Sequence, residues 1–224
     1  MRFSDDDRSV LHFFMADQIV DQSDLVDILA KITNENASAA DCEIVIERIN
    51  HQVEKFCQKI VKVTCELTGQ KSFALISTAA APGMKSQFSK EQIAYFHALM
   101  DSIVQNEGRI DSITAINMAS DATDGKVTVS NAESQLLHFV NKKLLMSDGS
   151  NYYLSPIAIA EYGSFISAHY ETASCAICQK MTIFGQQCAS CLAILHKHCL
   201  KDYLRNTAQA KCPSCQNAWQ FDDF

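Results

Sequence analysis

The chain has 224 residues, of which 47% are hydrophobic and 20% charged, with a formal net charge of −7; these values favour an ordinary globular protein of two or three domains. No hydrophobic run approaches the roughly eighteen residues needed to cross a membrane, and no segment has the strongly basic character of an autonomous nucleic-acid-binding domain. Because the N-terminus, MRFSDDDRS, is acidic where a secretory signal would be basic, we expect a reducing intracellular compartment, in which clustered cysteines indicate metal ligands.

Residues 1–85 predict a first winged-helix domain. Helical periodicity covers residues 7–20, 23–32 and about 38–60. Two β-rich runs, VKVTCEL and SFALIST, follow and are separated by the turn-forming TGQK, which indicates a hairpin. Three helices closed by a hairpin describe a winged helix. The residues expected to be buried in the first and third helices are Val10, Leu11, Phe14, Ile19 and Val20, and Ile44, Ile46, Ile49, Val53 and Phe56.

The same order of elements recurs in residues 86–172 and predicts a second winged-helix domain. Capping-box patterns starting at Ser89 and Ser130 each precede a helical stretch. A second hairpin is expected to turn at Asp148-Gly149, and Pro156 occupies the first position of a further helix. The fold class is therefore α+β and multidomain, with tandem winged helices.

The third predicted helix of the first domain, which could contact DNA, carries both acidic and basic side chains. Its charges would repel phosphate about as often as they attract it, and the pair Lys142 and Lys143 is the best basic feature of the second domain. We expect these domains to dock other proteins and to bind DNA only weakly or indirectly. The charged residues of the helix are Asp41, Glu43, Glu47, Arg48, Glu54, Lys55 and Lys59.

The ten cysteines are distributed very unevenly. Cys42, Cys57 and Cys65 have no ligand spacing and are interpreted as small core thiols. The other seven lie between Cys175 and Cys215, within a predicted small zinc domain at 173–224.

The clustered cysteines and one histidine form four pairs, each separated by two residues. This spacing lets a tight turn present two donors to one tetrahedral ion. His196 has that spacing to Cys199, whereas His198 is adjacent to Cys199 and is expected to face solvent. Eight sulfur and nitrogen ligands predict two closed Zn²⁺ sites, filled in sequence or interleaved, and the gaps suit an interleaved cross-brace. The predicted sites are Cys175, Cys178, His196 and Cys199, and Cys188, Cys191, Cys212 and Cys215.

Two kinds of zinc module share this ligand order. Plant homeodomain (PHD) fingers, which read histone tails, normally carry an aromatic residue where this chain has Ala210. RING fingers, which recruit ubiquitin-conjugating enzymes, carry an aliphatic residue before the second ligand, an aromatic residue after the sixth and a proline after the seventh. This chain has Ile177, Tyr203 and Pro213 at those positions, which favours the RING-like alternative.

The C-terminal block CAICQKMTIFGQQCASCLAILHKHCLKDYLRNTAQAKCPSCQNAW, preceded by tandem winged-helix patterns, resembles the non-SMC element 1 family. Members of that family are RING-like subunits of the SMC five/six chromosome-maintenance and DNA-repair complex. The resemblance implies a nuclear protein that pairs with a MAGE-type subunit, contacts a kleisin subunit and acts as a RING-type ubiquitin ligase. It also implies that Ile177, Tyr203 and Pro213 dock the conjugating enzyme.

A RING module contributes no catalytic nucleophile, so no catalytic residue is predicted; it orients the ubiquitin thioester for attack. This chain departs from the pattern of active RING fingers at Gln216. The position after the eighth ligand is often cationic, and an uncharged glutamine there implies weak activity that depends on the partner. A non-catalytic, zinc-stabilised scaffold and a PHD-like histone reader remain the alternatives.

Overall fold

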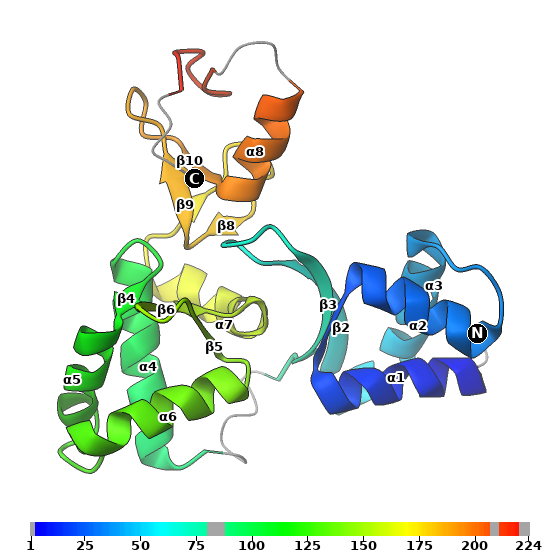
Figure 1. Ribbon diagram of the computed structural model, residues 1–224, viewed down its shortest axis with the longest axis horizontal. Helices are drawn as coiled ribbons and strands as arrows, with labels where there is room; N and C mark the ends of the chain where they lie inside the picture. The colour runs from blue at the N-terminus through cyan, green and yellow to red at the C-terminus, as the bar shows by residue number, and fades with distance from the viewer. Residues whose placement is uncertain (1–2, 80–87, 207–210, 220–224) are drawn as a thin grey trace. The chain divides into compact units, whose positions relative to one another are not determined.

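The computed structural model describes residues 3–79, 88–206 and 211–219 (Figure 1). The chain divides into two compact units, each assembled from separate segments. None of the helices in the described residues is both long enough and apolar enough to span a bilayer. The first unit comprises Met1–Cys65, Gln70–Ser89 and Pro156–Tyr162; the second comprises Glu66–Gly69, Lys90–Ser155 and Gly163–Phe224.

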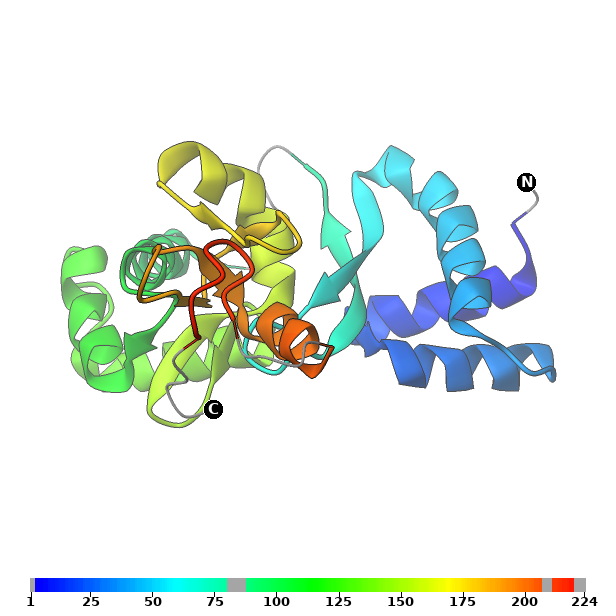
Figure 2. The ribbon, with the colours of Figure 1, turned by 90° about the horizontal axis from the view of Figure 1, so that it is seen from above.

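The first unit contains a winged helix. Its three strands form an antiparallel sheet in the order β1-β3-β2, with Val61 opposite Ala74, and the three helices lie together on one side of it (Figure 2). Capping boxes at Ser4 and Ser38 begin α1 and α3. The elements are α1 (Asp5–Asp17), β1 (Ile19–Asp21), α2 (Gln22–Thr33), α3 (Ala39–Val53), the 3₁₀ turn η1 (Glu54–Phe56), β2 (Gln58–Thr64) and β3 (Lys71–Ser77).

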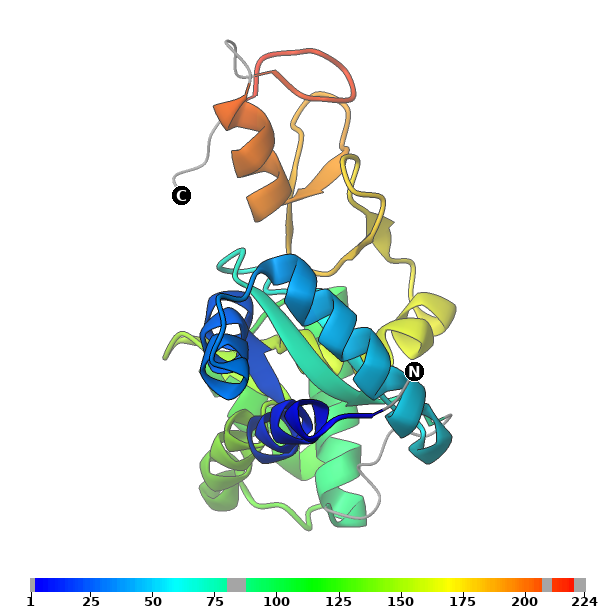
Figure 3. The same ribbon diagram turned by 90° about the vertical axis from the view of Figure 1, so that its right-hand side faces the viewer.

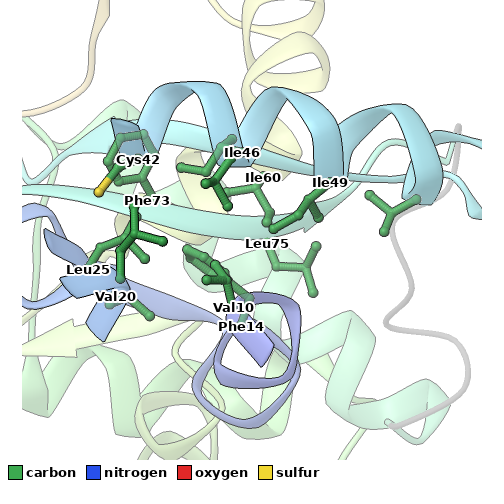
Figure 4. Close-up of a cluster of buried hydrophobic side chains, with 13 residues drawn as sticks. Val10, Phe14, Val20, Leu25, Cys42, Ile46, Ile49, Ile60, Phe73 and Leu75 are labelled. Atoms are coloured by element: carbon green, nitrogen blue, oxygen red, sulfur yellow. The ribbon is translucent and has the colours of Figure 1, made fainter. Parts of the chain in front are cut away.

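The buried core of this unit lies between the helices and the sheet (Figure 4). Val10 and Phe14 are fully buried, as expected. Ile19 and Val20 belong to strand β1 and not to the first helix, because the chain turns at Gln18, which has φ of 58°. The core residues are Val10, Phe14, Val20, Leu25, Leu29, Cys42, Val45, Ile46, Ile49, Val53, Ile60, Phe73 and Leu75.

The predicted buried side of the third helix is wrong at two of its five positions. The helical stripe starts at Cys42 and continues through Val45, so Ile44 points away and is 47% exposed. Phe56 lies beyond the end of α3, in η1, and is 68% exposed. Cys57, interpreted as a core thiol, is also exposed, whereas Cys42 and Cys65 are buried.

The second winged helix packs its helices around an aromatic centre. The ring centroids of Phe139 and Phe96 lie 5.6 Å apart. The three strands of this winged helix are antiparallel, in the order β4-β6-β5. The helix predicted to be capped by Ser130 instead begins two residues earlier than expected, at Val129 with Thr128 at the N-cap, so that capping box is wrong. The elements are α4 (Lys90–Gln105), β4 (Ile110–Asp111), α5 (Ser112–Ala122), α6 (Val129–Asn141), β5 (Leu145–Ser147) and β6 (Asn151–Leu154). Helix α7 (Pro156–His169) follows, and its first part, Pro156–Tyr162, belongs to the first unit.

The cysteine-rich module forms the C-terminal part of the second unit. Strands β9 and β10 pair antiparallel, and α8 lies beside β10 (Figure 3). Its small buried core consists of three cysteines with Leu195, Leu200 and Trp219. The elements are β7 (Ala173–Ser174), β8 (Met181–Thr182), β9 (Gly185–Gln187), β10 (Ile194–His196) and α8 (Lys197–Arg205).

Candidate metal centre

Three of the four ligand pairs lie in turns with the same backbone pattern. In each, the residue after the second cysteine adopts a left-handed conformation with φ of 61°. Its N–H donates to the carbonyl oxygen of the first cysteine, at 2.8 Å for Gln179, 2.9 Å for Leu192 and 3.0 Å for Gln216. The repeated geometry turns the two sulfur atoms of each pair toward the same side of the turn.

The fourth pair uses a strand end and a helix start. His196 is the last residue of β10 and the N-cap of α8, and Cys199 lies in the first turn of that helix. The strand thus positions the imidazole, and the helix positions the thiol three residues later.

The structure brings the eight side chains into two groups of four. The ligand atoms of each group lie within 4.8 Å of one another. The first and third pairs along the chain make one group, and the second and fourth make the other, which is the interleaved arrangement. The first group is Cys175, Cys178, His196 and Cys199, and the second is Cys188, Cys191, Cys212 and Cys215.

The separations within the groups fit a tetrahedral ion. A metal–sulfur bond of about 2.3 Å places two thiolates about 3.8 Å apart. In the second group, the Sγ atoms of Cys188 and Cys215 are 3.8 Å apart, and those of Cys191 and Cys212 are 3.7 Å apart. In the first group, His196 Nδ1 lies 3.3 Å from Cys178 Sγ and 3.8 Å from Cys199 Sγ. Both groups can therefore bind a metal ion.

The other ring nitrogen of His196 faces away from the sulfurs. Nε2 lies 3.2 Å from Glu66 Oε1, 3.1 Å from the carbonyl oxygen of Met181 and 3.2 Å from Thr182 Oγ1. Nδ1 is thus the nitrogen placed to bind a metal, and Nε2 carries the outer hydrogen bonds. Glu66 was missed by the sequence analysis, because nothing local connects it to a histidine 130 residues later.

The surroundings of the first group shift the pKa values of three of its four members. Burial opposes ionisation of Cys175, but backbone N–H groups, including those of Cys178 and Ile177, lower its pKa to about 6. Burial and the negative charge of Cys175 raise the pKa of Cys199 to about 12. For His196, burial alone would lower the pKa, but the hydrogen bond and charge of Glu66 raise it to about 9. Ionisation of Cys199 beside an ionised Cys175 therefore requires a compensating positive charge.

His198 is half-buried, so the expectation that it faces solvent is wrong. Its ring stacks on that of His196, with centroids 4.9 Å apart and an interplanar angle of 18°. A Cβ added to Gly69, which has φ of 76°, would lie 2.9 Å from the His198 Cβ. His198 therefore packs under the loop that carries Glu66, although it belongs to neither ligand group.

The three predicted docking residues lie at or near the surface. Ile177 stands between the two cysteines of the first turn and is 37% exposed, while Pro213 and Tyr203 are half-buried. Gln216 is exposed, and its side-chain amide donates to the carbonyl oxygen of Pro213. Ala210, on which the comparison with PHD fingers depends, lies outside the described residues.

Together, the tandem winged helices and the two interleaved ligand groups define a RING-like, metal-binding class of protein. Residues 175–215 match the family model of the RING-like domain. Residues 7–161 match the model described as the Nse1 non-SMC component of the SMC5-6 complex. Because that match covers well over half of this chain, the chain belongs to the Nse1 family.

Curated relatives and a solved structure agree with this assignment. The rat protein named non-structural maintenance of chromosomes element 1 homolog is 29% identical over 197 residues, covering 86% of this chain and 74% of the rat protein. Its human counterpart is 27% identical over 194 residues, covering 84% and 73%. A chain in a structure titled "Nse1-Nse3-Nse4 complex" superimposes with a TM-score of 0.85 at 21% identity over the whole of both chains, which shows the same fold.

Proposed function

We propose that this chain is a RING-type ubiquitin ligase subunit of an SMC5-6 complex that acts in chromosome maintenance and DNA repair in the nucleus. Each ligand group binds one Zn²⁺, and the zinc module recruits a ubiquitin-conjugating enzyme. The winged helices dock a MAGE-type subunit corresponding to Nse3, and the chain also contacts a kleisin subunit corresponding to Nse4.

Zinc is the metal that suits the donors best. Thiolate and imidazole donors in closed four-coordinate groups are typical of structural zinc, and this chain presents seven cysteines and one histidine in that arrangement. With all four positions of each ion taken by the protein, no position remains for a reactive water. The zinc ions therefore serve the fold, and the chemistry belongs to the conjugating enzyme.

The observation that carries the ligase proposal is the exposed Ile177 on the first turn of the module. An aliphatic side chain held by a rigid zinc-binding turn gives a conjugating enzyme a fixed apolar contact. Pro213 directly follows the first cysteine of the third such turn, so the two residues belong to different ligand pairs but to the same kind of turn. The contribution to rate is one of positioning, because it holds the ubiquitin thioester ready for a substrate amine.

A ubiquitin-discharge assay tests this proposal. The full chain, with and without its MAGE-type partner, is mixed with a panel of charged conjugating enzymes, and loss of the thioester to free lysine is followed. Ile177→Ala should abolish the acceleration given by the responsive enzyme. Ile113→Ala, which truncates a 71% exposed isoleucine of α5, should leave it unchanged.

A non-catalytic scaffold is the second candidate, and Gln216 favours it. An uncharged side chain after the eighth ligand cannot pair with an acidic group of ubiquitin as a cation would. If no conjugating enzyme is stimulated in the presence of the partner, the scaffold function stands. If Gln216→Arg raises discharge, the missing charge accounts for weak activity and the ligase function stands.

The surface of α3 supports docking to protein over direct reading of DNA. A surface depression beside this helix is lined by acidic as well as basic side chains. One of its lysines, Lys62, is engaged by Glu43 at 3.0 Å. Such a surface gains little from phosphate. The charged lining residues are Glu43, Glu47, Glu54, Lys59 and Lys62.

A further inference from the structure

Glu66 is a buried carboxylate in the loop between β2 and β3. It is 8% exposed, and it belongs to the second compact unit together with the cysteine-rich module, although β2 and β3 belong to the first. A buried carboxylate is costly unless it is hydrogen-bonded or paired. The Glu66 carboxylate is hydrogen-bonded by groups that surround the first metal group.

All the partners of the Glu66 carboxylate lie in the cysteine-rich module. Oε2 accepts the backbone N–H of Phe184 at 2.6 Å and that of Ile183 at 3.2 Å. Oε1 lies 3.2 Å from Nε2 of His196. One side chain thereby joins the backbone after β8 to the imidazole that ends β10.

The segment held by Glu66 is also tightly packed from other sides. A Cβ added to Gly108 would lie 2.5 Å from the carbonyl oxygen of Ile183, so only a glycine fits there. The ring of Phe184 meets that of Tyr153 edge-on at 5.4 Å, and Nζ of Lys197 lies 4.9 Å from its centroid. The carboxylate therefore sits on an immobilised segment, which gives its second oxygen a defined position relative to His196.

We propose that Glu66 is a positioning residue of the first metal group, acting as the outer hydrogen-bond partner of the ligand His196. The proposal rests on the assignment of zinc made above. The carboxylate accepts the Nε2 proton, holds the ring with Nδ1 toward the sulfurs, and makes the imidazole a stronger donor to the ion. Retention of one of the two zinc ions then depends on a loop more than one hundred residues before the first ligand.

The size of the effect follows from the number of remaining acceptors. Loss of an outer partner typically weakens metal binding by about 10- to 100-fold. In Glu66→Gln, the Met181 carbonyl oxygen would remain within reach of Nε2. We therefore expect the lower end, about a tenfold faster release of one zinc ion, with release of the other unchanged.

The test is transfer of zinc from the full chain to a chromophoric chelator, with metal content measured beforehand. Glu54→Gln, the same change at an exposed glutamate, is the matched control and should behave as the unaltered chain. Release from the group of four cysteines serves as an internal reference. If Glu66→Gln releases both ions at the unaltered rates, Glu66 has no positioning role.

A double-mutant cycle separates positioning of His196 from a general role in the fold. In His196→Cys the first group has four thiolates and no Nε2 proton, so adding Glu66→Gln should change its zinc release less than twofold. An equal acceleration in both backgrounds would assign the effect to folding and overturn the proposal. An unaltered chain that holds fewer than two zinc ions would overturn the zinc assignment itself.

Nitrogen-15 spectra of the unaltered, zinc-loaded chain give a second measurement that needs no variant of Glu66. The His196 imidazole should carry its proton on Nε2, with metal on Nδ1. The opposite assignment would place the metal on the nitrogen that faces Glu66 and would refute the arrangement.

Discussion

The assignment of His196 and not His198 as a metal ligand is tested by a pair of alanine substitutions. His196→Ala removes the only nitrogen donor from the first group and leaves three sulfurs. Three donors leave the tetrahedron open, so the ion should be lost or strongly weakened. We expect the zinc content of the purified chain to fall from two ions to one.

His198→Ala should leave both ions bound at a modest cost in stability. The substitution keeps the Cβ that packs against Gly69 but removes the ring that stacks on His196 at 4.9 Å. Ring pairs of this kind contribute about 0.5–1.5 kcal/mol beyond the area they bury. With the ring only half-buried, we expect a loss of about 1 kcal/mol, more than a fully exposed residue would give.

The two variants are compared by elemental analysis for zinc and by thermal unfolding. Loss of zinc from His198→Ala together with retention in His196→Ala would refute the ligand register. The positions of Tyr203 and Pro213 relative to the ligands would then have to be assigned again.

Three further predictions concern the second metal group, the first winged helix and DNA. Cys188→Ser should lose one zinc ion and shift the fluorescence of Trp219, the only tryptophan, as its buried environment opens, whereas Cys57→Ser at an exposed site should change neither. Asp7→Asn should destabilise the chain by about 2–4 kcal/mol, because it removes the charge that pairs with the partly exposed Arg48 at 2.7 Å. Burial opposes ionisation of Asp7, but the pairing with Arg48 lowers the pKa of Asp7 below 3.8. The stabilisation by the ion pair is therefore complete above pH 3.8 and is lost as the pH falls further. The difference in urea unfolding between the variant and the parent should shrink over that lower pH range. A fragment of residues 1–172 should bind duplex DNA weakly and with little salt dependence in fluorescence anisotropy, and tight, steeply salt-dependent binding would contradict the docking function.

The metal ligands could be predicted from the sequence because the pattern that reveals them, the two-residue spacing, is local. A spacing of two residues is a property of one turn, and the three cysteine turns share one hydrogen-bond pattern. The nine- and twelve-residue gaps between pairs favoured interleaving, and in the structure the β9–β10 hairpin separates Cys188 and Cys191, at its tip, from His196, at its end. No long-range information was needed for either step.

The errors in the first winged helix come from helix ends and register. Ile44 was assigned to the buried side because the predicted helix ran seven residues too far, which shifted the apparent stripe. Cys57 lies in the turn after η1 with φ of 55°, and composition cannot distinguish such a turn from a core position. Strands β1 and β4 have three and two residues, too few for an alternating pattern to be detected.

Glu66 could not be found from the sequence for a different reason. In the run VKVTCEL it reads as the polar residue of an edge hairpin, where a glutamate normally faces water. Its burial depends on contacts with residues 117 to 130 positions later. Only the tertiary structure distinguishes it from Glu54, an exposed glutamate at the other end of the hairpin.

The smallness of the cysteine-rich module explains why such a residue is needed. Three of the six residues in its buried core are cysteines of the metal groups, leaving Leu195, Leu200 and Trp219 as the apolar remainder. So few side chains cannot offset the conformational entropy of the ordered module, and metal binding has to supply most of its folding free energy. Any group that strengthens a ligand therefore also stabilises the module.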